Sequence, residues 1–300
     1  EGTKVVITDP DNGNQWKFIL HPTQPIQINN DEVWIKTPIQ SIIALSGTDI
    51  GMLSKLDGVS LIKGVANSNY IFSEELKKFV KLGKVSSFGG DESDSYEKII
   101  ECKSSVLTYS CFGKEFPHTD QLQHAGTICI PVFDWKEVHP LGKAEWIKLY
   151  GCLTGKTEQA DSYFKAIESD YQRLVKLSNN YFKKPSVLSG NMTGDIWFCP
   201  AGESYFAKLI RDAGANYKYQ STKGTGSLSL SLEKITSENK ETAFWINPGI
   251  AKINDLIASN PKASFFTAYK TRSIYCYSAN MNKYWELAAI EPNHVLSDLI

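Results

Sequence analysis

The longest stretch of the chain with a single hydrophobic period lies near its middle, between Val138 and Leu177. Apolar residues recur there at steps of three and four with charged residues between them, which is typical of amphipathic helices and leaves no strand signal. Pro140 stands at a helix-start position and Gly155 at a helix stop. The pattern therefore predicts one helix over 140–155 and a second, strongly amphipathic helix after it.

Short β-rich runs alternate with amphipathic runs on both sides of this stretch. IIAL at 42–45 and TICIPVF at 127–133 precede it, and PSVLS at 185–189 and AFWIN at 243–247 follow it. Strand, helix and strand in succession favour a mostly parallel sheet covered by helices. The sequence therefore predicts an α/β fold of two α/β lobes joined by a rigid interdomain helix, with a ligand cleft between the lobes and boundaries at 1–136, 137–156 and 157–300.

The predicted joining helix sets an expectation about motion. About 16 residues at 1.5 Å per residue give a strut of about 24 Å. Bending such a strut would break its hydrogen-bond ladder, so we expect lobes that rock slightly and do not close widely.

Two local signals lie in the first 60 residues. Asn12-Gly13 separates two β-rich runs and predicts a hairpin. Asp9 and Asp11 beside it resemble part of a calcium loop, but the glycine comes one place too early, so a turn is favoured. Further on, Thr48 or Asp49 is predicted to cap a helix that ends near residue 56.

Composition removes several classes of function. The chain has 300 residues, 42% of them hydrophobic, which is enough for two modest cores. Its 32 basic and 33 acidic residues balance, so nucleic acid is not an expected partner. No apolar run approaches the 18 residues of a membrane span. The six cysteines are scattered without a C-x-x-C pair, which disfavours zinc and favours buried free thiols.

The catalytic and nucleotide motifs are incomplete. GCLTGKT at 151–157 has three residues between its glycines where a phosphate loop requires four, and it lies between two helices. GESYF at 202–206 lacks the second glycine of a nucleophile elbow. The five histidines have no ligand spacing, although His118 and His124 lie close enough to a strand to reach a cleft. We therefore predict no catalytic residue, no metal site and no cofactor.

Aromatic residues give a stronger signal, because several follow predicted strands or lie in Gly/Pro loops. Ligands of open α/β sheets bind at the carboxyl ends of strands, where aromatic side chains supply large apolar contacts. Core packing is the alternative for each of them, and for Trp34 it is favoured. The predicted ligand-binding residues are Ser46, Gly47, Thr48, Asp49, Phe112 and Trp135 on one side of the cleft, and Trp197, Phe198, Tyr205 and Trp285 on the other.

Several longer segments resemble a known family. DIWFCPAGESYFAKLIRDAGANY at 195–217, GSLSLSLEKI at 226–235 and the closing EPNHVLSDLI look like substrate-binding proteins of ABC importers that carry ferric siderophores, haem or cobalamin. PLGKAEWIKLYGCLTGKTEQAD is similar to the interlobe segment of that family. The resemblance covers nearly the whole chain.

The resemblance implies a non-enzymatic monomer, either periplasmic or a lipid-anchored lipoprotein that faces the periplasm. Such a protein captures a metal chelate, an iron complex such as a ferric siderophore or haem, and delivers it to an inner-membrane permease with its ATPase. The family also implies one docking glutamate on each lobe. Glu97 in SYEKII and Glu233 in SLEKI match these positions, while two solvated carboxylates at helix starts are the alternative.

The ligand itself stays open at this stage. Arg173, Arg211 and Arg272 fall on predicted helices or at a strand start, so no set of arginines for an anionic siderophore is evident. This favours a neutral or aromatic-contacting ligand, with cobalamin as the nearest variant. An α/β enzyme with unrecognised catalytic residues and a lectin-like module that binds sugars are the alternatives from other classes.

Overall fold

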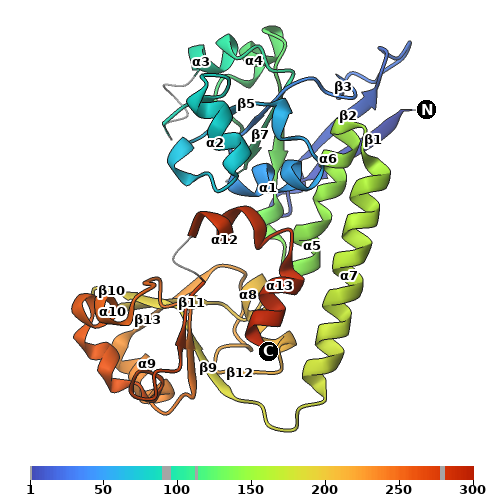
Figure 1. Cartoon of the computed structure of the whole chain (residues 1–300). Coiled ribbons are helices and arrows are strands. Elements are labelled where there is room, and N and C mark those ends of the chain that lie inside the picture. The colour runs from blue at the N-terminus through green and yellow to red at the C-terminus, as the bar shows by residue number, and fades with distance from the viewer. Residues whose placement is uncertain (1, 90–95, 112–113, 278–280) are drawn as a thin grey trace. The chain divides into compact units, whose positions relative to one another are not determined.

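A computed structural model describes residues 2–89, 96–111, 114–277 and 281–300 (Figure 1). The chain forms two compact units and passes between them several times. The first unit comprises Glu1–Lys136, Lys143–Ala166 and Trp285–Ile290, and the second comprises Glu137–Gly142, Ile167–Tyr284 and Glu291–Ile300. The central helical stretch, predicted as a separate body, is thus shared by the two units, and six residues near the end of the chain rejoin the first unit.

The first unit contains a five-stranded parallel sheet with the order β6-β5-β4-β7-β8. Every residue of the central strand β4 is buried, as expected where helices cover both faces of a parallel sheet. The predicted α/β architecture with a parallel sheet is confirmed here. The strands are β4 (Ile42–Ala44), β5 (Ile62–Val65), β6 (Ser86–Ser87), β7 (Val106–Ser110) and β8 (Ile128–Val132).

Four helices belong to this sheet: α1 (Gly47–Lys55), α2 (Glu74–Lys81), α3 (Tyr96–Glu101) and α4 (Thr119–His124). Ser46 caps α1, because its side chain accepts a hydrogen bond from the backbone N–H of Asp49 at 3.1 Å. The Asp49 carboxylate in turn accepts a hydrogen bond from the Ser46 N–H at 3.3 Å, which completes a capping box. The prediction that Thr48 or Asp49 is the cap was therefore wrong by two or three residues.

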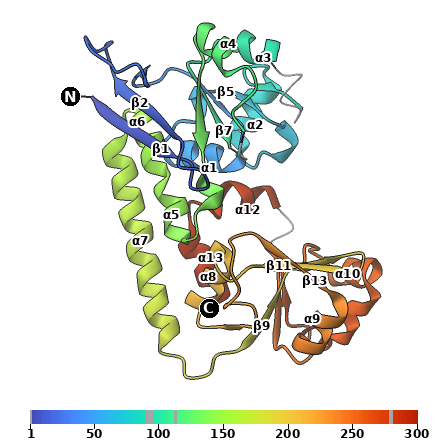
Figure 2. The ribbon, with the colours of Figure 1, turned by 180° about the vertical axis from the view of Figure 1, so that it is seen from behind.

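A small sheet precedes these elements and is formed by β1 (Thr3–Thr8), β2 (Gln15–His21) and β3 (Glu32–Lys36). β1 and β2 pair antiparallel (Figure 2), and Gly13 takes the positive φ of +77° that their turn requires. Asp9 accepts the N–H of Asp11 at 2.9 Å and lies 3.2 Å from the Lys136 amine. The predicted hairpin is confirmed, and its aspartates serve the turn and an ion pair.

The central stretch consists of α5 (Pro140–Glu145), α6 (Ile147–Thr154) and α7 (Thr157–Asn179). The helix start at Pro140 and the stop at Gly155, which has a φ of +72°, are confirmed. The single helix predicted over 140–155 is wrong, because the chain turns at Trp146 between α5 and α6. The continuous element is α7, whose 23 residues run from the first unit into the second.

The second unit contains two sheets. One is parallel with the order β12-β9-β14-β15, and the other is antiparallel with the order β10-β11-β13. The antiparallel sheet was not predicted. The strands are β9 (Ser186–Ser189), β10 (Asn191–Thr193), β11 (Ile196–Pro200), β12 (Asn216–Tyr217), β13 (Ser227–Ser231), β14 (Phe244–Ile246) and β15 (Ile274–Tyr275).

Helices of this part of the chain pack around an aromatic core. The rings of Trp197, Trp245 and Phe266 lie with centroids 5.1 to 5.5 Å apart, and all three are buried. No helix in the described ranges has the length and apolarity needed to cross a lipid bilayer. The helices are α8 (Tyr205–Asp212), α9 (Leu232–Asn239), α10 (Ile253–Ser259), α11 (Thr267–Lys270), α12 (Met281–Leu287) and α13 (Pro292–Leu299).

Candidate functional site

The first group of candidate ligand residues lies at the carboxyl edge of the five-stranded sheet. The residues at 46–49 follow β4, and the 3-10 turn Asp134–Lys136 follows β8, so two parallel strands deliver both loops to one edge. The Thr48 side chain lies close enough to the Asp134 carboxylate to lower its pKa, so the two loops are neighbours. Trp285 belongs to this group as well, because its carbonyl oxygen would lie 3.5 Å from a Cβ placed on Gly47.

Asp49 supports this edge from inside. Its carboxylate is buried and accepts hydrogen bonds from the Tyr150 hydroxyl at 2.6 Å and the Thr108 hydroxyl at 2.8 Å. Burial raises the pKa of Asp49 against these hydrogen bonds. The prediction that Asp49 contacts a ligand is therefore wrong, and its role is to fix the loop that carries Ser46 and Thr48.

Asp134 is a second buried carboxyl at this edge, which sequence reasoning missed. Burial raises its pKa to about 6, and the nearby Asp49 adds to that shift, while Lys143 and the N–H of Trp135 oppose it. The sequence signal was available, because Asp134 directly precedes the predicted Trp135 at the end of a strand. The edge therefore carries a carboxyl whose charge changes near neutral pH.

Trp135 is 39% exposed and held from behind. The Lys136 amine lies 5.1 Å from the Trp135 ring centroid and 5.3 Å from that of Phe133, within cation–π range. Asp9 pairs with the same amine and so links the N-terminal hairpin to this loop. Trp135 therefore presents part of its ring to solvent from a fixed base.

The second group lies within the second unit and consists of three tyrosines. Tyr277 and Tyr284 stack with centroids 4.0 Å apart and an interplanar angle of 14°, and the hydroxyls of Tyr205 and Tyr284 are 3.5 Å apart. Burial raises the pKa of Tyr277 and of Tyr284, so these phenols stay neutral near pH 7. Only Tyr205 was predicted, although Tyr277 lies near the end of the last predicted strand, RSIYCYS at 272–278, and Tyr284 precedes Trp285.

Other predicted residues of this unit lie elsewhere. Trp197 is 0% exposed and donates its indole N–H to the carbonyl of Ser189 at 3.0 Å, so its prediction as a ligand contact is wrong. Phe198 points to the opposite face of β11 and is partly exposed, and its ligand role stays a prediction. Phe112 falls outside the described residues.

Both predicted docking glutamates are accessible. Glu97 is exposed in the first turn of α3, and Glu233 is exposed in the first turn of α9. Glu233 also lines a shallow hollow of about 630 Å³ whose wall includes Lys240, Lys262 and Phe265. These positions allow contact with a partner, and the docking role stays a prediction.

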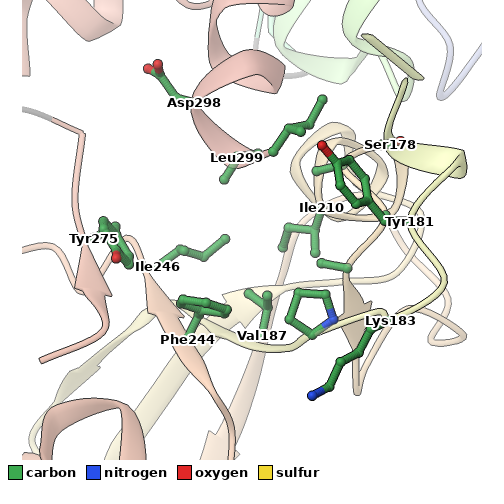
Figure 3. Close-up of a pocket in the computed structure, with 15 residues that line it drawn as sticks. Ser178, Tyr181, Lys183, Val187, Ile210, Phe244, Ile246, Tyr275, Asp298 and Leu299 are labelled. Atoms are coloured by element: carbon green, nitrogen blue, oxygen red, sulfur yellow. The ribbon is translucent and has the colours of Figure 1, made fainter. Parts of the chain in front are cut away.

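A separate apolar pocket of about 460 Å³ lies within the second unit (Figure 3). Its walls include Ile210, Ile246 and Leu299, and none of the predicted site residues lines the described part of it. The Lys183 amine and the Asp298 carboxylate are directed away from the central space in Figure 3. The centre of this pocket is therefore lined mainly by apolar side chains.

The described residues thus form two α/β units with aromatic side chains next to strand ends, Trp135 after β8 and Tyr277 after β15. The model of the periplasmic binding protein family matches residues 42–281. The chain therefore belongs to this family of binding proteins.

Curated relatives and solved structures are similar to this chain over most of its length. An uncharacterized lipoprotein of Methanocaldococcus jannaschii is 24% identical, over 98% of this chain and 76% of the relative. A periplasmic binding protein from Veillonella parvula superposes with a TM-score of 0.71 at 15% identity, over 99% of this chain and 97% of the other. The periplasmic haem-binding protein of Vibrio cholerae superposes with a TM-score of 0.69 at 12% identity, over 87% of this chain and 98% of the other. The vitamin B12-binding protein of the same organism superposes with a TM-score of 0.62 at 10% identity, over 87% of this chain and 95% of the other.

Proposed function

We propose that the chain is the substrate-binding component of an ABC importer, and that it captures a metal chelate and delivers it to an inner-membrane permease and its ATPase. The observation that carries the proposal is the grouping of Thr48, Trp135 and Trp285 at the carboxyl edge of the first sheet. That edge is where open α/β sheets bind ligands, and its exposed tryptophans offer large apolar contacts.

The chemistry of the two groups favours a bulky ligand with aromatic or macrocyclic faces. Tyr205, Tyr277 and Tyr284 supply stacked, neutral phenols, and the first group contains the carboxyl of Asp134 instead of a set of arginines. An anionic siderophore would need cations for charge pairing. Haem or a similar iron complex with a large aromatic face therefore leads this proposal on the evidence of the tyrosine rings, and cobalamin is the alternative of the same class.

In this proposal α7 makes the link between the units stiff. Its 23 residues continue from one unit to the other, and bending them would break backbone hydrogen bonds. Glu97 and Glu233 would each meet an arginine of the permease. A lipid anchor is proposed because the relative from Methanocaldococcus jannaschii is named a lipoprotein.

A melting experiment with a panel of ligands tests the proposal. Purified protein is heated with haemin, a ferric hydroxamate siderophore, cyanocobalamin or a set of mono- and disaccharides. A ligand at 100 times its Kd stabilises the folded state by about 2.7 kcal/mol, so one chelate should raise Tm by several degrees. A shift with sugars alone would support the lectin-like alternative, and no shift with any chelate would contradict the proposal.

A further inference from the structure

Residues 285–290, here called the return segment, belong to the first unit although their neighbours Tyr284 and Glu291 belong to the second. The segment packs against α1 with little space to spare. A Cβ on Gly51 would lie 1.9 Å from the carbonyl oxygen of Glu286 and 2.5 Å from the Cδ1 atom of Ile290. α1 therefore has a glycine where the backbone of the return segment touches it.

Glu286 is the one acidic residue of the return segment, and its side chain is buried with 2% exposed. Its carboxylate accepts the backbone N–H of Phe72 and also that of Ser73, with 3.2 Å and 3.1 Å from the Ser73 nitrogen to the two oxygens. Ser73 caps α2 through its own side chain. Since burying a carboxylate is costly unless it is hydrogen-bonded, these N–H donors compensate the burial of Glu286 only when the segment is seated.

Trp285, the residue before Glu286, lies at the edge that carries the candidate ligand residues. Trp285 is 53% exposed, and its backbone lies next to Gly47 in the loop that begins α1. Its carbonyl and the Cγ atom of Glu286 are both within 4 Å of a Cβ built on Gly47. The indole is therefore carried by a short piece of chain whose place on the first unit depends on the buried carboxylate and on the close fit at Gly51.

We propose that Glu286 is a positioning residue for ligand binding, which fixes the return segment on the first unit and so holds the Trp285 indole at the ligand edge. This inference rests on the proposed function. It adds that Trp285 acts with the loop of Ser46 and Thr48, although it stands more than 200 residues away in the sequence. A purely structural Glu286 would affect the melting temperature and leave the orientation of Trp285 unchanged.

The test uses protein labelled with 5-fluorotryptophan, with the fluorine resonance of Trp285 assigned through Trp285→Phe. Glu286→Gln keeps the size of the side chain but places an NH₂ group against two N–H donors, and Gly51→Ala displaces the segment from the other side. Both should shift or broaden the Trp285 resonance while the resonances of buried Trp197 and Trp245 stay in place. Glu75→Gln, an exposed glutamate on α2, is the control and should change none of them.

Affinity for haemin and for cyanocobalamin is then measured on the same variants. Glu286→Gln and Trp285→Ala should each weaken the chelate that the wild type binds by about tenfold, which equals about 1.4 kcal/mol. An unmoved Trp285 resonance, or a moved resonance with unchanged affinity, overturns the inference. If the wild type binds neither of these chelates nor the ferric hydroxamate siderophore, the proposed function fails, while the fluorine spectra still decide whether Glu286 positions Trp285.

Discussion

Buried polar side chains fix the loops at the carboxyl edge of the five-stranded sheet in the first unit. Asp49 receives bonds from Thr108 on β7 and Tyr150 on α6, so one carboxylate ties a strand and a helix to the start of α1. Thr48, in the same loop, interacts with the buried carboxyl of Asp134. Removing one partner from such a network leaves the others unsatisfied, so the loop depends on the whole set.

Asp134 leads to a prediction about pH. Its pKa is raised from 3.8 to about 6 in the folded state, so the fold favours the protonated form. The stability that this contributes is complete below pH 3.8 and is lost as pH rises to about 6, with a total of about 3 kcal/mol. Asp134→Asn removes the charge and should gain up to that amount relative to wild type between pH 4 and pH 8. Urea unfolding at four pH values measures it.

The control for this experiment is Asp120→Asn, which changes an exposed carboxyl of α4. Its effect on the free energy of unfolding should stay small at every pH. A difference between Asp134→Asn and wild type that does not change with pH would show that Asp134 titrates like an exposed aspartate.

Trp197 leads to a prediction about stability. Its ring is buried against Trp245 and Phe266, so Trp197→Ala should lower the free energy of unfolding by about 3 to 5 kcal/mol and leave chelate affinity unchanged. Phe198→Ala, on the exposed face of the same strand, should cost far less. Lost affinity with intact stability would return Trp197 to the ligand site. Denaturant melts and chelate titrations decide between the two.

The sequence could not separate Trp197 from Trp285 by itself. IWFCP is apolar at every position, so strand alternation gives no inside or outside face for Trp197. Its burial depends on β10 and β13, which pair with β11 as an antiparallel sheet. Trp285 stands in α12, and the residues of this helix that precede it belong to the second unit. Only long-range contacts reveal that Trp285 lies beside Gly47.

At the scale of elements, local sequence signals predicted where helices begin and end better than whether a helix continues without a break. Pro140 and Gly155 marked real helix ends because proline and glycine each solve a backbone problem there. The turn at Trp146 has no such signal, and the sequence showed one helix in place of α5 and α6. The continuous helix is α7, which the amphipathic pattern did predict.

α7 leads to a prediction at this scale. Ala166 is exposed and is the last residue that α7 contributes to the first unit. Ala166→Pro removes a backbone hydrogen bond and should cost about 3 kcal/mol or more, whereas Ala166→Ser should cost about 0.5. In solution scattering the wild type should show a nearly constant radius of gyration on chelate addition, and the proline variant a larger change. Equal changes in both would show that α7 does not limit the motion.

At the scale of the whole molecule, the proposed docking to a permease uses Glu97 and Glu233, one in each unit. Exposed ion pairs contribute about 0 to 1 kcal/mol each and are screened by salt, which suits a carrier that must release its permease. Glu97→Ala combined with Glu233→Ala should leave chelate affinity unchanged and sharply reduce uptake by transporter reconstituted in vesicles, more so at low salt, where the ion pairs of the wild type are not screened.

The matched control for docking is Glu101→Ala, an exposed glutamate on the same helix as Glu97. Uptake with this variant should equal that of wild type. If the double variant loses chelate affinity and uptake falls only in proportion, the two glutamates belong to the ligand site and the docking proposal is wrong.

The most direct measurement of the central claim is an equilibrium titration of the purified protein with haemin and with cyanocobalamin, followed by absorbance of the chelate. We predict saturable binding of one of them at one chelate per chain, with Kd at or below about 1 μM, equivalent to about 8 kcal/mol. Trp285→Ala and Tyr205→Ala should each raise that Kd, while Phe182→Ala, an exposed control away from both groups, should not. Non-saturable binding of both chelates, or a Kd that none of these substitutions changes, would contradict the account.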